Sequence, residues 1–271
     1  MDPMMKLMPY IMPTRNDACN WFRGQADAEN IDKYVQEKRQ NGFTNFTQMH
    51  VVLAAYTRLV SQRPGLNRFV SGQKIYARNN LEVMLTVKKE MKLNAPEAVV
   101  SMVYPLDATA EQVYKITEDL IAEAKSETTS FDSLVKVLDY IPGFVKGLAI
   151  GLLRMLDYFG WLPGWLKKLS PFHGSLFITS MASLGLPPVY HHIYNFGNVP
   201  VFIALGVPEK KRTVKLDGTT ESRKMLNYTL VMDERICDGH YYASAFRLFN
   251  GILRNPWQLD EAPASVVEDV D

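Results

Sequence analysis

The sequence predicts an α/β fold in which helices pack on a β-sheet. Short apolar runs typical of buried strands alternate with longer segments whose apolar residues recur every three or four positions. This interleaving of strands and long helices favours a two-layer sandwich over an all-β fold. The 271 residues fit one large domain, and an apolar fraction of 47% is ample for its core.

The first half of the chain is expected to alternate helices and strands. Asp27 can cap a short helix, and Thr47 can cap a buried helix that Pro64-Gly65 ends. In order, we expect a helix from 27, a helix over 47–63, strands over 82–87 and 98–103, and a helix from 109.

Residues 131–169 are unusually apolar and predict two helices on either side of Pro142-Gly143. Helices that are apolar around their circumference are usually buried, so we expect a helical hairpin packed on the domain or on a sister subunit. The alternatives are a lid over a tunnel or an in-plane membrane anchor with interfacial Trp161 and Trp165. Membrane attachment is not expected, because the hairpin lacks a polar face rich in Lys and Arg.

The last part of the chain predicts strands and a closing helix. Strands are expected at 176–180, 199–207 and 227–232, and the last two flank a hairpin whose Asp217-Gly218 pair suits a tight turn. A helix over 242–253 follows. We therefore divide the chain into an N-terminal tail (1–12), one domain (13–262) and an acidic, loosely ordered tail (263–271).

Charge and cysteine usage exclude several classes of protein. A net charge of +1 argues against a nucleic-acid partner. Cys19 and Cys237 match no metal spacing and no disulfide framework, so we expect a reducing, cytoplasmic setting. The adjacent His191 and His192 are a poor chelate without nearby carboxylates or thiols, so no metal is expected; we expect this pair on a loop near a subunit interface.

The nine residues 233–241 carry the most specific signal. They read Asp-Glu-Arg-Ile-Cys-Asp-Gly-His-Tyr and lie between a strand-like run and an amphipathic helix. The stretch resembles the Asp-His-Arg-x-x-Asp-Gly signature of chloramphenicol acetyltransferases and of dihydrolipoyl acyltransferases, with Glu234 at the position of the histidine. Weaker likenesses to the same superfamily lie at 13–22, 43–69, 175–185 and 201–206.

The resemblance implies the CoA-dependent acyltransferase fold, a mixed sheet covered by helices, in a homotrimer whose sites lie between subunits. It implies a coenzyme A thioester as acyl donor and a thiol or hydroxyl as acceptor. No lipoyl attachment is expected in this chain, because no lipoyl-lysine module precedes residue 13.

Residue by residue, the resemblance implies a site with an altered base. Glu234 takes the histidine's place, and a carboxylate is a poor base unless burial raises its pKa. Ser180 or Ser183 corresponds to the hydroxyl that stabilises the oxyanion. Asp238 is expected to pair with Arg15. Gly239 is expected to need the absence of a Cβ in a tight turn.

Two functions remain open from the sequence. The protein is a divergent acyltransferase in which Glu234 or a substrate group supplies the base, or it is a non-catalytic trimeric scaffold that has lost the histidine. A membrane-surface protein that uses 131–169 as an anchor is a weaker alternative.

Overall fold

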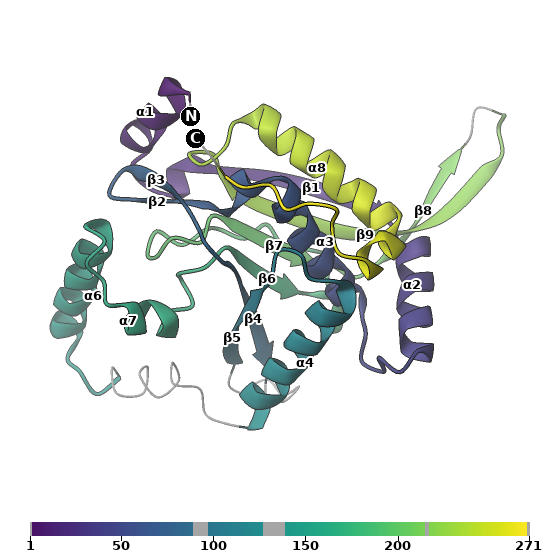
Figure 1. The fold of residues 1–271 in the computed structure, drawn as a ribbon, viewed down its shortest axis with the longest axis horizontal. Helices are drawn as coiled ribbons and strands as arrows, with labels where there is room; N and C mark the ends of the chain where they lie inside the picture. Colours follow the sequence, from purple (N-terminus) through teal and green to yellow (C-terminus); the bar gives the residue numbers. More distant parts are fainter. Residues whose placement is uncertain (1, 89–96, 127–138, 215–216, 270–271) are drawn as a thin grey trace.

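A mixed seven-stranded sheet forms the centre of the protein (Figure 1). The structure is a computed structural model that describes residues 2–88, 97–126, 139–214 and 217–269. The strand order is β1-β9-β7-β6-β4-β5, with β8 paired to β9. The strands are β1 Cys19–Asp27, β4 Leu81–Lys88, β5 Glu97–Tyr104, β6 Leu176–Ser180, β7 Val201–Leu205, β8 Glu209–Val214 and β9 Thr220–Asp233; β2 Arg68–Ser71 and β3 Lys74–Ala77 form a separate ribbon.

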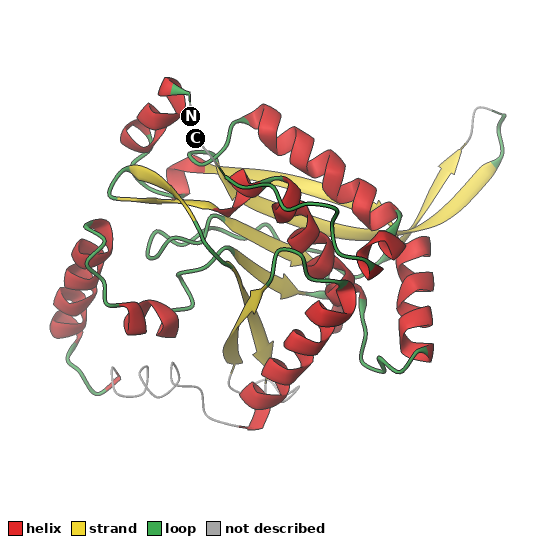
Figure 2. Ribbon diagram, viewed as in Figure 1, coloured by secondary structure: helices red, strands yellow, loops and turns green. Residues whose placement is uncertain are grey.

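Four helices pack together on one face of this sheet, so the predicted helix-on-sheet sandwich is confirmed (Figure 2). They are α2 Ala28–Gln40, α3 Gln48–Gln62, α4 Ala110–Ser126 and α8 Gly239–Arg254. α3 contacts α2, α4 and α8. The predicted N-caps are present: Asp27 accepts the N–H of Glu29 at 2.9 Å, and Thr47 begins α3 in a capping box.

The parallel strands lie in the middle of the sheet. β4 pairs in parallel with β6, and β6 with β7, while the other pairs are antiparallel. The hairpin expected directly between 199–207 and 227–232 contains an additional strand, β8, which pairs with the first part of β9. The Asp217-Gly218 turn joins β8 to β9, with Gly218 at φ +80° and Asp217 accepting the N–H of Thr219 at 2.9 Å.

The two faces of the sheet are covered differently. The face under the helices holds the larger core, which includes the fully buried Tyr34, Tyr228 and Tyr242. The opposite face holds a smaller cluster to which Ile193 and Val199 of the loop before β7 contribute. Its buried members are Cys19, Met84, Phe177, Ile193, Val199, Phe202, Ala204 and Val231.

The apolar insertion is only partly described and does not pack as expected. The first predicted helix lies mostly outside the described residues, whereas the second is present as α6 Gly143–Tyr158, followed by α7 Gly164–Leu169. Neither helix has a buried residue. Of the two expected packing partners, the chain's own domain therefore does not bury these two helices, and packing on a sister subunit stays a prediction.

Both ends of the chain are more ordered than the sequence predicts. Residues Pro3–Ile11 form helix α1, which contacts β3. The acidic tail lies along the end of α3: Val267 N–H donates to Ser61 O at 2.8 Å, and Arg68 pairs with Asp269 at 2.7 Å. Within the described parts of the chain, no helix is long and apolar enough to cross a membrane.

Candidate active site

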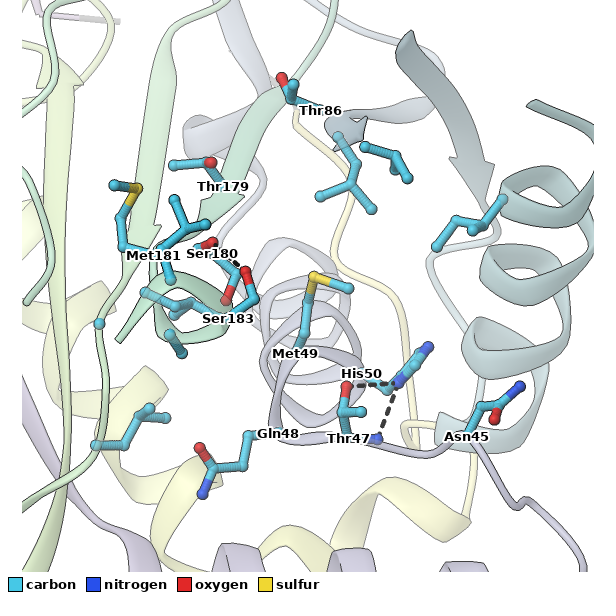
Figure 3. Close-up of a pocket in the computed structure, with 18 of the residues that line it drawn as sticks. Asn45, Thr47, Gln48, Met49, His50, Thr86, Thr179, Ser180, Met181 and Ser183 are labelled. Atoms are coloured by element: carbon cyan, nitrogen blue, oxygen red, sulfur yellow. Dashed lines mark hydrogen bonds between the residues drawn. The ribbon is translucent and has the colours of Figure 1, made fainter. Parts of the chain in front are cut away.

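A broad cleft of about 1620 Å³ opens where the parallel strands end. Its lining includes the ends of β4, β6 and β7, through Val87, Ser180 and Leu205, and the first turn of α3. Side chains beyond the carboxyl ends of parallel strands converge in this way, which is why such ends commonly form ligand sites. Figure 3 shows the hydroxyls of Thr179, Ser180 and Ser183 in this cleft together with residues of α3.

Both serine candidates for oxyanion stabilisation line the cleft. Ser180 is the last residue of β6, and Ser183 lies in the 3-10 turn Ala182–Leu184 that follows. The Ser183 hydroxyl donates to Ser180 O at 3.4 Å, a long contact that a ligand could replace. Gly185 at φ +70° ends the turn. The strand end and the tight turn thus fix the backbone positions of the two serines on the cleft wall.

His50 lies on the cleft wall but is engaged in the capping box of α3. Its Nδ1 accepts the N–H of Thr47 at 3.0 Å, so Nε2 carries the proton, 3.4 Å from a Glu118 carboxylate oxygen. Burial lowers the pKa of His50 to about 4. A neutral imidazole with its acceptor nitrogen occupied is not a proton acceptor. Thr47 is the N-cap predicted from the sequence, and His50, three positions later, completes the capping box, a role that was not predicted.

His191 is the second histidine in the lining of the cleft, and the sequence placed it only on a loop near a subunit interface. Its Nδ1 donates to His192 O at 2.7 Å, which leaves Nε2 unprotonated and able to accept a proton. The ring stacks on Phe202 at 3.9 Å between centroids, and burial lowers the pKa of His191. The geometry therefore offers a second candidate base besides Glu234.

The motif segment lies at the other end of β9. Glu234 directly follows the strand and is partly buried, and its N–H donates to Ala18 O at 2.8 Å. On either side of it, Asp233 and Arg235 form a buried ion pair, with nitrogen–oxygen distances of 2.8 and 2.7 Å. Glu234 is thus held between two anchored neighbours.

Arg15 and Asp238 do not pair with each other, contrary to the expectation. Arg15 is buried and donates to Gly197 O, and burial lowers its pKa to about 10, an effect that nearby Asp233 opposes. Asp238 is exposed and caps α8 by accepting the N–H of Tyr241 at 2.7 Å. The helix N-terminus satisfies Asp238, and the buried carboxylate near Arg15 is Asp233.

Gly239 also differs from its expected role. A Cβ built at this position meets nothing within 4 Å, and the residue has no positive φ because it is the first residue of α8. The steric need for glycine predicted here is therefore absent.

The serines and Glu234 lie far apart within one chain. The register pairs Ser180 with Leu205 and Leu205 with Tyr228, and Glu234 follows Tyr228 by six residues. At about 3.3 Å per residue, the separation along the strand is roughly 20 Å. One copy of the chain cannot bring these residues to the same acyl group.

Comparison with known proteins gives similarity of structure only. No protein-family model matches the sequence, and no curated protein matches it. A structure from Listeria monocytogenes described as a probable dihydrolipoamide acetyltransferase is 14% identical, with a TM-score of 0.62 over 98% of this chain and 97% of that one.

Two further structures support the same fold. The dihydrolipoamide acetyltransferase of Azotobacter vinelandii, whose mechanism was examined at a serine, a histidine and an asparagine, is 14% identical, with a TM-score of 0.63 over 96% of this chain and 93% of its own. A chloramphenicol acetyltransferase is 10% identical, with a TM-score of 0.54 over 93% and 96% of the two chains. The mixed sheet and its helices therefore have the fold of these acyltransferases.

Proposed function

We propose, on the premise of this chloramphenicol acetyltransferase-like fold, that the protein is a divergent acyltransferase that moves an acyl group from a coenzyme A thioester to a thiol or hydroxyl acceptor. The observation that carries the proposal is the cleft at the ends of the parallel strands, with the hydroxyls of Ser180 and Ser183 on its wall. Arg39 and Lys125 also line the cleft and are cations suited to the phosphates of the donor.

Each candidate residue has a distinct role in this reaction. A serine hydroxyl donates to the oxyanion that forms when the acceptor attacks the thioester carbonyl, an interaction that contributes about 10²–10³-fold in other acyl-transfer enzymes. Glu234 takes the acceptor's proton. As a carboxylate it is a weaker base than an imidazole at neutral pH, so turnover is expected to be slow.

We further propose that the active unit is an oligomer, with the trimer as the expected form. The roughly 20 Å between Ser180 and Glu234 within a chain supports this, because the serine of one copy must then meet Glu234 of another. A shared site also gives a reason for the broad opening of the cleft in the single chain.

The test measures thiol release from a panel of acyl-CoAs with and without acceptor. Wild type should be slow, Glu234→Gln should lower the rate further, and Glu234→His should raise it by about 10²-fold or more, the low end of general-base contributions. A parallel His191→Gln variant separates the two candidate bases. If His191→Gln abolishes turnover and Glu234→Gln does not, the base is His191.

The second candidate is a non-catalytic scaffold or binding protein with the same fold. The exchange of the signature histidine for Glu234 favours it, and His240, the nearest histidine in the sequence, is exposed beyond the Asp238 cap. The scaffold function is supported if neither wild type nor Glu234→His turns over any acyl-CoA while thermal melts show that both proteins are folded.

A further inference from the structure

One face of α6 carries large apolar side chains outward. Phe144 is 75% exposed and Leu148 72%, and Leu152, Met155 and Phe159 continue the row along and just beyond the helix. These residues recur every three or four positions and therefore share one face. A helix on a soluble protein normally turns such a face toward the core, so the orientation of α6 is the reverse of the usual one.

Polar contacts hold the helix in this orientation. Asp157, on the opposite side of α6, lies 3.1 Å from His173 Nε2, and its carbonyl accepts the Ser71 hydroxyl at 2.9 Å. Tyr158 donates to Gln73 at 2.9 Å. The end of α6 is thus tied to the turn between β2 and β3 and to the segment before β6. The outward apolar face is a consequence of these contacts.

The apolar surface continues beyond α6. Trp161 and Trp165, which lead into and begin α7, are 68% and 64% exposed. Helix α1 exposes Leu7 and Ile11 and contacts β3, the strand next to the turn that holds α6. Figure 1 shows α1, the β2–β3 ribbon and α6 at the same end of the molecule. We call the exposed apolar residues of α1, α6 and α7 the apolar end.

The charges of the apolar end indicate what covers it. Arg154 lies on α6, and Lys167 and Lys168 lie on α7. Lys146 shares the side of α6 that carries Asp157, away from the apolar row, and pairs with Asp139 at 3.7 Å, whereas Asp157 faces His173. Two copies that met through this surface would bring like charges together, which disfavours association. An anionic lipid surface would attract Arg154, Lys167 and Lys168 while its acyl chains accept the apolar row and its interface accepts the tryptophans.

We infer that the apolar end is a lipid-docking surface, with α6 and α7 lying in the headgroup plane of a bilayer that contains anionic lipid. The inference replaces the sequence-based expectation that membrane attachment is absent. It does not depend on the proposed acyl transfer, since it rests on surface residues outside the cleft.

Co-sedimentation with vesicles tests the inference, using phosphatidylcholine alone or phosphatidylcholine mixed with phosphatidylglycerol. Wild type should bind the mixed vesicles, and Leu148→Ser combined with Leu152→Ser should weaken the partition coefficient by about tenfold or more, because both side chains lose apolar contact with lipid. Lys167→Gln with Lys168→Gln should reduce the preference for phosphatidylglycerol. Val214→Ser on β8, also 70% exposed, is the matched control and should bind like wild type.

Two results would overturn the inference. One is the absence of wild-type binding to either vesicle. The other is binding that the apolar variant leaves unchanged while light scattering shows that the same variant dissociates an oligomer, which would assign the surface to a second copy. Thermal melts confirm folding, and because every readout is a mass or a partition coefficient, failure here leaves the acyl-transfer test intact.

Discussion

Asp233 and Arg235 form a buried ion pair with two hydrogen bonds, one residue on either side of Glu234. Replacing Asp233 by Asn should lower the free energy of unfolding by about 3–5 kcal/mol, because Arg235 would remain buried without a counter-charge. Urea denaturation measures the change. Asp238→Asn is the control: asparagine caps a helix as well as aspartate does, so a change within about 0.5 kcal/mol is expected. Similar losses in both variants would contradict this assignment.

Arg15 and Asp238 should act independently, because each has its own partner. Arg15→Ala leaves the carbonyl of Gly197 without its buried donor and should cost about 1–3 kcal/mol, whereas Asp238→Ala removes a cap worth about 1 kcal/mol. In a double-mutant cycle the two effects should add within about 0.5 kcal/mol. A clearly larger coupling energy would contradict this and would support the Arg15–Asp238 ion pair that the sequence resemblance implies.

Two glycines should respond oppositely to alanine. Gly197 has φ +79°, and a Cβ there would lie 2.0 Å from Phe172 O, so Gly197→Ala should destabilise the fold by about 2 kcal/mol or more. Gly239→Ala has open space at a helix start and should be neutral or stabilising by up to about 1 kcal/mol. Thermal melts compare the two variants. Strong destabilisation by Gly239→Ala would instead support the predicted tight turn that requires glycine at this position.

His50 should make stability fall with acidity. Burial lowers its folded-state pKa to about 4, whereas an unfolded histidine titrates near 6.5, so only the unfolded state takes up this proton between those values. Glu118 at 3.4 Å acts in the opposite sense and Arg39 in the same sense as burial. Stability is therefore unaffected by this group above about pH 6.5 and should decrease by up to about 3 kcal/mol toward pH 4. His50→Gln keeps an acceptor for the N–H of Thr47. Urea titrations from pH 7 to 4 should show that the free energy of unfolding falls less steeply in this variant than in wild type. An unchanged slope would exclude His50 as the cause.

Mixing two inactive variants should restore activity if sites are shared. A variant lacking Glu234 and a variant lacking both Ser180 and Ser183 are mixed after mild dissociation and reassembly. In random oligomers about a quarter of the sites would combine an intact serine wall with an intact Glu234. Recovery near this fraction of the wild-type rate is expected. No recovery, with mass measurements proving that mixed oligomers form, would mean that the site lies within one chain.

Features that depend on chain neighbours were predictable from the sequence. The helix expected over 47–63 is α3 Gln48–Gln62, and the closing helix expected over 242–253 is contained in α8. The Asp217-Gly218 turn is also present. Caps, turns and apolar periodicity depend on residues three or four positions apart, so a short stretch of sequence is enough to predict them. The resemblance of residues 233–241 to the acyltransferase signature predicted the fold, which the structural comparisons support.

Partners distant in the sequence were decided only by the tertiary structure. Arg15 meets Gly197 across 182 positions, and the strand register separates Ser180 from Glu234 although the resemblance assigns both to one reaction. Likewise, apolar periodicity identifies a stripe on α6, but only its contacts with Ser71 and His173 turn that stripe outward. A periodic pattern predicts which residues share one face of a helix. Which surface that face contacts depends on how the other elements are buried and hydrogen-bonded. Those contacts form only when the chain folds, so the sequence pattern alone does not determine them.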